Sequence, residues 1–127
     1  MSYKKITVEE FSEIVDIKKI KEEWFLIASE KENKVNTLTA SWGAVGNLWN
    51  KPVIFIFVRP QRYTTEFLQA SNEFTVTFFD GYKKELGYLG TVSGRDEDKI
   101  SKVGFNIEYV DGKPVFKEGN LIATCKV

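Results

Sequence analysis

The sequence contains no histidine, and Cys125 is the single cysteine among its 127 residues. The lack of histidine excludes Ser-His and Cys-His catalysis, histidine-based metal sites and a histidine proton switch. One cysteine excludes an internal disulfide and any CxxC redox or zinc motif, which fits a reducing, intracellular compartment. We therefore expect Cys125 to be a small core residue on a strand.

The chain also lacks a net charge, because 18 basic residues balance 18 acidic residues. No summed field attracts nucleic acid or an anionic membrane, and the aromatic residues lie in apolar runs rather than along a basic stripe. No apolar run is long enough to span a bilayer, and the N-terminal MSYKK leads into no signal-peptide core. We expect a soluble, cytoplasmic protein with no nucleic-acid or membrane partner.

The residues that are present predict one mainly β domain with short helices, over residues 1–127. The chain has no linker, internal repeat or low-complexity segment. Apolar patterns and turn signals predict strands at residues 24–29, 36–42, 52–58, 73–79, 105–110, 113–116 and 121–127. Helical spacing and capping residues predict helices at residues 8–15, 66–69, 82–89 and 97–103. Thr7 begins the first helix, Gly90 ends the helix at residues 82–89, and Gly104 ends the last helix, which Asp96 caps. Asp111-Gly112 forms a hairpin turn.

The stretch from residue 36 to residue 65 organises the rest of the chain. The unbroken apolar run at residues 52–58 predicts a strand that is buried on both faces. A cationic corner follows it directly, composed of Arg59, Pro60, Arg62, Tyr63, Thr64 and Thr65. Thr64 or Thr65 is placed to cap the next helix, so backbone N–H groups, two guanidinium groups and three hydroxyls would converge on a phosphate. The alternative is that these arginines are only surface cations.

Two further segments could extend such a site. Thr37, Thr39 and Ser41 fall on one face of the strand at residues 36–42, where they meet either solvent or a polar ligand. The loop at residues 93–99 also contains a hydroxyl group and two cationic side chains. Neither GxxxxGK[ST] nor GxGxxG is present, so a nucleotide would bind without a P-loop or Rossmann motif.

Several of these motifs follow one another in a set order. They read Asn36-x-x-Thr39-x-Ser41-Trp42-Gly43, Lys51-Pro52, Arg59-Pro60-x-Arg62-Tyr63-Thr64, Phe74 and Ser93-Gly94-x-Asp96-x-x-Lys99. In this order they resemble the flavin reductase-like family of FMN-binding split barrels, and especially its flavoredoxin-type branch, over most of the chain from Trp24 onward. The resemblance implies a six-stranded Greek-key barrel that binds flavin mononucleotide near a dimer interface.

The resemblance also implies a role for each matched position. The residues that would lie along the flavin are Thr39, Ala40, Ser41 and Trp42. Those that would hold the phosphate and part of the ribityl chain are Arg59, Arg62, Tyr63 and Thr64. Ser93, Gly94 and Lys99 would close the site, and Lys99 or Arg95 could place a cation near the pyrimidine edge. No catalytic side chain and no metal is implied, because the flavin carries the redox chemistry.

The implied function is that of a flavin oxidoreductase that passes hydride or electrons between NADH or NADPH and flavin, or on to a downstream acceptor. A homodimer and a redox protein partner are implied as well. Two alternatives stay open: a non-catalytic FMN-binding electron carrier, and a degenerate split barrel that acts as an interaction module. Family members usually continue for several dozen residues past the equivalent of Cys125, whereas this sequence stops at Val127. We therefore expect a C-terminally shortened barrel or one completed by another subunit.

Overall fold

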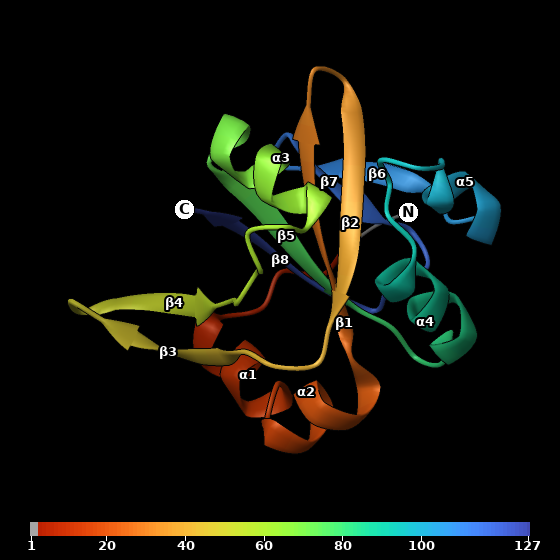
Figure 1. The fold of residues 1–127 in the computed structure, drawn as a ribbon. Helices are drawn as coiled ribbons and strands as arrows, with labels where there is room; N and C mark the ends of the chain where they lie inside the picture. Colours follow the sequence, from red (N-terminus) through yellow and green to blue (C-terminus); the bar gives the residue numbers. More distant parts are fainter. Residues whose placement is uncertain (1–2) are drawn as a thin grey trace.

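The computed structural model describes residues 3–127, which form eight strands and five helices (Figure 1). Some of the strands form a central open sheet. The helices are α1 Val8–Ile14, α2 Ile17–Glu23, α3 Tyr63–Ser71, α4 Lys83–Thr91 and α5 Lys99–Val103. The strands are β1 Phe25–Lys31, β2 Lys34–Ala40, β3 Ala44–Leu48, β4 Lys51–Phe55, β5 Glu73–Phe78, β6 Ile107–Val110, β7 Lys113–Phe116 and β8 Leu121–Lys126. The predicted class, mainly β with short helices, is confirmed.

The main sheet has the strand order β2-β1-β5-β8, and every neighbouring pair is antiparallel. Ile27 on β1 lies opposite Leu38 on β2 and opposite Val76 on β5. The hairpins β3–β4 and β6–β7 form two separate small sheets. The strands therefore enclose a barrel that is split rather than closed.

Strand β1 is buried on both faces because a core lies on each side of it. Phe25 and Ile27 pack into a first core with α1, α2 and the hairpin β3–β4. Leu26 and Ala28 pack into a second core with α4, α5 and β7. This two-sided burial explains why the strand reads as a continuous apolar run instead of an alternating one.

Local signals at several element ends are confirmed. The Glu10 N–H group donates to Thr7 Oγ1 at 3.1 Å and the Thr7 N–H group donates to Glu10 Oε1 at 3.0 Å, which completes the predicted capping box. Asp111, with a φ of 52°, and Gly112, with a φ of 75°, form the tight turn between β6 and β7. Gly104 ends α5 in the left-handed conformation.

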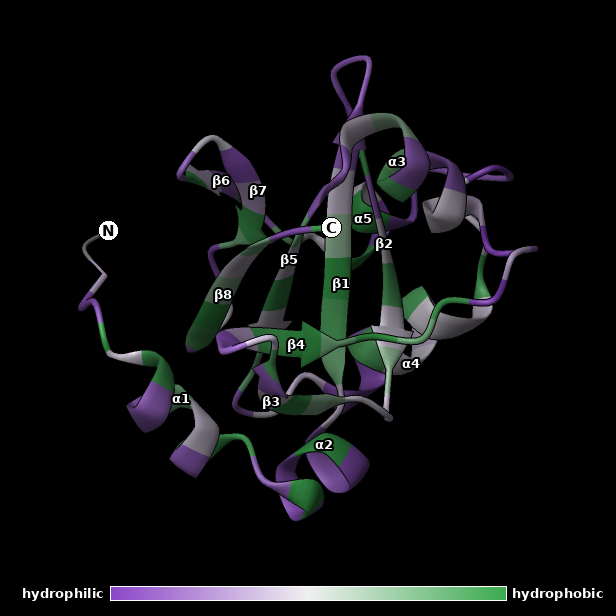
Figure 2. Cartoon of the chain, turned by 90° about the vertical axis from the view of Figure 1, so that its left-hand side faces the viewer, coloured by the Kyte–Doolittle hydropathy of each residue, from purple (hydrophilic) through white to green (hydrophobic). Residues whose placement is uncertain are grey.

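The prediction of a fully buried strand at residues 52–58 is wrong. Strand β4 stops at Phe55 and, among the strands of residues 3–127, pairs only with β3, although it is hydrophobic along much of its length (Figure 2). Ile54 and Ile56 pack against the first core, whereas Phe55 and Phe57 have exposed fractions of 38% and 61%. An apolar run is buried on both faces only where the fold covers both, and within residues 3–127 nothing covers the outer face of this hairpin.

The predicted helix caps also need correction. Arg62 stands at the N-cap of α3 without a side-chain cap, and Thr64 and Thr65 lie inside the helix. Asp98, not Asp96, caps α5. Gly90, predicted to end the helix at residues 82–89, lies inside α4, which continues to Thr91. Sequence spacing alone cannot show which of two neighbouring residues caps a helix, because the exact start of the helix depends on the rest of the fold.

Candidate functional site

The cationic corner precedes α3 and is shaped by one backbone oxygen. The Arg59 carbonyl accepts from the Arg62 N–H group at 3.0 Å and from Thr65 Oγ1 at 2.9 Å. These bonds turn the chain so that α3 begins at Tyr63, and the N-cap residue Arg62 makes no side-chain capping hydrogen bond. The first turn of a helix without such a cap attracts anions, since its N–H groups and dipole carry partial positive charge.

Thr64 connects this corner to β2 and to the loop that follows α4. Asn36 Nδ2 donates to Thr64 Oγ1 at 2.9 Å, and these residues are only 3% and 1% exposed. Gly94 lies directly against the Asn36 amide. The structure thus brings Thr64 and Gly94, from the two separate sequence motifs, together around Asn36, a member of the first motif without a predicted role.

Lys99 is a buried cation, only 2% exposed. Its Nζ donates to the carbonyls of Leu89 at 2.8 Å and Val92 at 2.7 Å, which lie at the C-terminal end of α4. Burial, and then repulsion by the Arg62 guanidinium, lower the pKa of Lys99 to about 8. Neither Arg62 nor Lys99 forms an ion pair with a carboxylate within residues 3–127. Arg62, at the N-cap of α3, and the buried Lys99, whose pKa it lowers, are two cations without a carboxylate partner among residues 3–127, and such cations favour an anion.

The lowered pKa of Lys99 predicts a pH-dependent stability. The unfolded chain binds more protons at this position than the folded chain between about pH 8 and pH 10.5, so the contribution of Lys99 to the free energy of unfolding rises with pH across this window. Lys99→Met removes that titration. Urea denaturation of both proteins below pH 8 and close to pH 10.5 should show a stability difference that shifts toward the wild type at the higher pH. A difference that does not change with pH would contradict the assignment.

The loop between α4 and α5 folds over the start of α3. The Arg95 N–H group donates to Ser93 Oγ at 3.1 Å, so the Ser93 hydroxyl shapes the loop itself. The Arg95 guanidinium lies 4.6 Å from the centre of the Tyr63 ring and pairs with Glu66. Lys34 Nζ donates to the Gly94 carbonyl at 3.4 Å and completes the contact with β2.

Close packing of the loop predicts a large difference between two glycines. A Cβ atom at Gly94 would lie 2.0 Å from Asn36 Oδ1, and the hydrogen-bonded Asn36 has little room to move. We expect Gly94→Ala to lower the free energy of unfolding by about 1–3 kcal/mol. Gly87→Ala is the matched control, because Gly87 lies inside α4 with no atom within 4 Å of the added Cβ, and alanine there should stabilise by about 0.5–1 kcal/mol. Equal responses in urea denaturation would argue against this packing.

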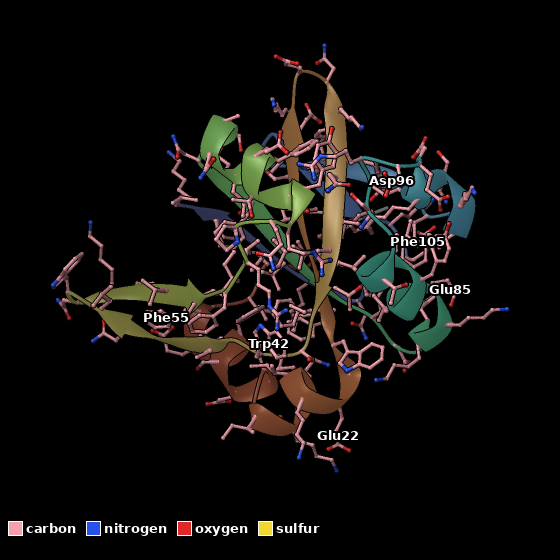
Figure 3. The ribbon with its side chains drawn as sticks, viewed as in Figure 1. Glu22, Trp42, Phe55, Glu85, Asp96 and Phe105 are labelled. Carbon is pink, nitrogen blue, oxygen red and sulfur yellow. The ribbon has the colours of Figure 1, made fainter. Side chains whose placement is uncertain are left out.

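The residues at the C-terminal end of β2 lie apart from the cationic corner. Thr39 Oγ1 donates to the Leu86 carbonyl at 2.5 Å, so α4 covers the predicted hydroxyl face that might have met solvent. The Ala40 side chain packs into the first core. Ser41 is half-buried, and Trp42 is 54% exposed where the chain leaves β2 (Figure 3). The side chains of Thr39 and Ala40 are therefore occupied within the fold, whereas those of Ser41 and Trp42 are partly or largely exposed.

A separate, mainly apolar groove has a volume of about 1440 Å³. It runs between α1, β4 and β8, and Thr65 is the one residue of the cationic corner that lines it within residues 3–127. Cys125 lines this groove, and burial raises the pKa of its thiol to about 11. The thiol is therefore an inert, largely buried group, in agreement with the expected core role.

Sequence reasoning missed part of the site. Asn36 joins Thr64 and Gly94, and Lys34 lies beside Tyr63, with its Nζ 3.3 Å from the phenolic oxygen. Asn36 was signalled by its place in the first motif, whereas Lys34 lies in a charged run typical of an ordinary turn.

No helix among residues 3–127 is long and apolar enough to cross a membrane.

The separate sheets form an open, split barrel, which is the fold of solved flavin reductase-like structures. The family pattern described as "Flavin reductase like domain" matches residues 17–127. The chain belongs to this family, as the sequence motifs predicted. Comparison with curated protein sequences gives no match.

Solved structures show the same fold. The chain is similar to an FMN-binding domain of a flavin reductases-like enzyme from Shewanella baltica, with a TM-score of 0.74 and 17% identity over 88% of this chain and 63% of that one. Flavoredoxin from Methanosarcina acetivorans gives a TM-score of 0.74 and 29% identity over 83% of this chain and 56% of that one. Flavoredoxin of Desulfovibrio vulgaris gives 0.72 and 25% identity over 81% and 58%. The chain therefore spans about three fifths of the length of these structures.

Proposed function

We propose that the chain binds FMN with its phosphate at the N-terminus of α3. The observation that carries this proposal is the pair of cations, Arg62 and Lys99, that no carboxylate within residues 3–127 neutralises. A phosphate dianion fits this donor set, because the helix N–H groups and two cations all donate to oxygen. The Thr64 hydroxyl, held by Asn36, adds a further polar group at the same place.

The other predicted residues extend this site in both directions. Arg59 and Tyr63 flank the first turn of α3, and Ser93 and Gly94 form the loop that packs against it. Toward the opposite end of β2, the positions that would contact the remainder of the cofactor are Thr39, Ala40, Ser41 and Trp42. Bound FMN would supply the electron-transfer chemistry, while this chain would bind, orient and partly shield it.

We propose that the activity is electron or hydride transfer between NADH or NADPH and flavin, or from flavin to a redox protein. Family membership supports the oxidoreductase class. The second candidate function is a non-catalytic electron carrier, which the likeness to two flavoredoxins favours. The two functions differ in whether the flavin-loaded protein oxidises the nicotinamide directly.

The visible absorption spectrum of the purified protein tests this proposal. After addition of FMN and desalting, a folded protein with a tight site should retain a protein-bound flavin spectrum. Oxidation of NADH or NADPH by the loaded protein, above the rate with free FMN, would then establish the enzyme. Retained flavin without turnover would favour the electron carrier. Absence of flavin binding, both after desalting and in a direct titration, would contradict the proposal and favour an interaction module.

We also propose that the chain forms a homodimer through the exposed apolar residues of the hairpin β3–β4 and of the segment that follows it. Phe57 is 61% exposed and Trp49, at the turn between β3 and β4, is 88% exposed. Clusters of such side chains commonly mark protein interfaces. Sedimentation velocity should give twice the chain mass of 14.6 kDa. The prediction would be contradicted if the wild type sediments as a monomer at all concentrations and the Trp49→Ser variant sediments identically.

A further inference from the structure

Asn36 carries a buried amide on β2, and the two polar ends of this amide face different elements. Asn36 Nδ2 donates to Thr64 Oγ1 on α3 at 2.9 Å. Gly94 packs so closely against Asn36 Oδ1 that a Cβ atom at this glycine would collide with it. The amide oxygen therefore faces the loop after α4, while the amide nitrogen faces Thr64. Because the amide is held on both sides, it fixes the direction of the hydrogen bond to Thr64.

The hydroxyl of Thr64 differs from those of the other buried threonines. Thr37 and Thr75 donate to backbone carbonyls at 2.7 Å and 2.6 Å, so their protons are used inside the fold. Thr77 has no hydrogen-bond partner within residues 3–127. Thr64, only 1% exposed, accepts from Asn36 and donates to no acceptor among the same residues. Its oxygen is thus already an acceptor, while its proton stays unused.

This unused proton lies at the corner where the phosphate is proposed to bind. Thr64 is in the first turn of α3, and Arg62 stands at the N-cap. The first N–H groups of a helix and a guanidinium group are all hydrogen-bond donors, so they supply no acceptor for the Thr64 proton. A phosphate dianion presents acceptor oxygens only, and it therefore completes the hydrogen bonding of a site that consists of donors.

We propose that Asn36 is a positioning residue that makes the Thr64 hydroxyl a hydrogen-bond donor to the phosphate of the ligand. By donating to Thr64 Oγ1, the Asn36 amide occupies one lone pair of the hydroxyl and leaves the proton for the ligand. Asn36 thereby favours a ligand group that only accepts hydrogen bonds over one that presents a proton of its own. This inference rests on the proposed FMN site, and it gives Asn36 a part in the selectivity of that site for phosphate.

A double-mutant cycle tests whether Asn36 acts through Thr64. FMN and riboflavin are titrated into the wild type, Asn36→Ala, Thr64→Val and the double variant. The ratio of the two affinities isolates the phosphate, which riboflavin lacks. We expect Thr64→Val to lower this ratio about tenfold and Asn36→Ala to lower it about three- to tenfold, because a charge-assisted hydrogen bond is lost or misdirected. In the Thr64→Val background, Asn36→Ala should change the ratio less than about twofold, since the hydroxyl that it orients is gone.

Three further variants separate positioning from folding. Thr64→Ser keeps the hydroxyl, so the ratio should stay within about twofold of the wild type and should still respond to Asn36→Ala. Thr75→Val is the matched control, because it removes a buried hydroxyl whose proton is already bonded within the fold. It should lower the free energy of unfolding in urea without changing the ratio. If Asn36→Ala does not fold, Asn36→Asp keeps the size of the side chain but accepts the Thr64 proton, and its loss should be smaller in the Thr64→Val background.

Several results would overturn the positioning role while FMN binding stands. One is an equal loss of FMN and riboflavin affinity in Asn36→Ala. Others are losses that add independently in the double variant, a wild-type ratio in Thr64→Val, and the same fall of the ratio in Thr75→Val. Absence of FMN binding by the folded wild type would overturn the proposed function together with this inference.

Discussion

Replacement of both Arg59 and Arg62 by alanine is expected to weaken FMN binding by about 2–4 kcal/mol, because charge-assisted contacts to the phosphate are lost. Arg62 should account for most of this loss. Its charge acts directly on the buried Lys99, whereas Arg59 is exposed and more strongly screened by solvent. Fluorescence titration of FMN into the wild type, both single variants and the double variant measures the effect.

Riboflavin provides the ligand control for this experiment, because it has the same ring and ribityl chain without the phosphate. Its affinity should be nearly equal in the wild type and in the double variant. Raised salt should weaken FMN binding to the wild type more than to the double variant, since fewer charges remain to be screened. Unchanged FMN affinity in the double variant would refute the phosphate assignment for the corner.

Phe79→Ala is expected to cause the largest loss of stability, about 3–5 kcal/mol in the free energy of unfolding. Phe79 is 1% exposed and follows β5 into the second core. Its ring stacks on that of Phe105 at 5.2 Å and contacts Phe116 with ring centres 6.3 Å apart. Removing it leaves a cavity between the main sheet and the segments that pack on it, which urea denaturation should detect.

Phe57→Ala is the matched control for Phe79→Ala, because Phe57 is 61% exposed in the segment after β4. Its removal should change the free energy of unfolding of the monomer by no more than about 0.5 kcal/mol. The second core also holds α4 and α5, which carry the carbonyl partners of Lys99 and Lys99 itself. Phe79→Ala should therefore weaken FMN binding as well. Similar stability losses in both variants would contradict the packing described for the second core.

Much of the fold could be predicted because its signals are local. The capping box at Thr7, the turn at Asp111-Gly112 and the end of α5 at Gly104 each depend on residues a few positions apart. Amphipathic or apolar patterns predicted the positions of most strands. The predicted strand ends differ from those in the structure by a few residues. Family membership was also predictable from the ordered motifs, although the overall identity to the solved structures is only 17–29%.

The errors came from segments whose environment is not local. The run at residues 52–58 is apolar throughout, yet Phe55 is 38% exposed because β4 has β3 as its single strand partner. The hydroxyl of Thr39 meets a helix carbonyl rather than solvent, because α4 packs across β2. In both cases the sequence pattern itself is real, but it does not show which element of the fold packs over the segment.

The sequence by itself determined the types of elements, the main turns, the family and the residues of the cationic corner, because each follows from neighbours along the chain or from ordered motifs. Tertiary structure alone decided that Asn36 meets Thr64, that Lys99 is buried near Arg62, and that Lys34 and Arg95 share the ring of Tyr63. These contacts join residues 28 to 37 positions apart, so they depend on how β2, α3 and the loop after α4 pack together. Burial and Coulomb energies are set by distance in space, and local sequence patterns do not encode that distance.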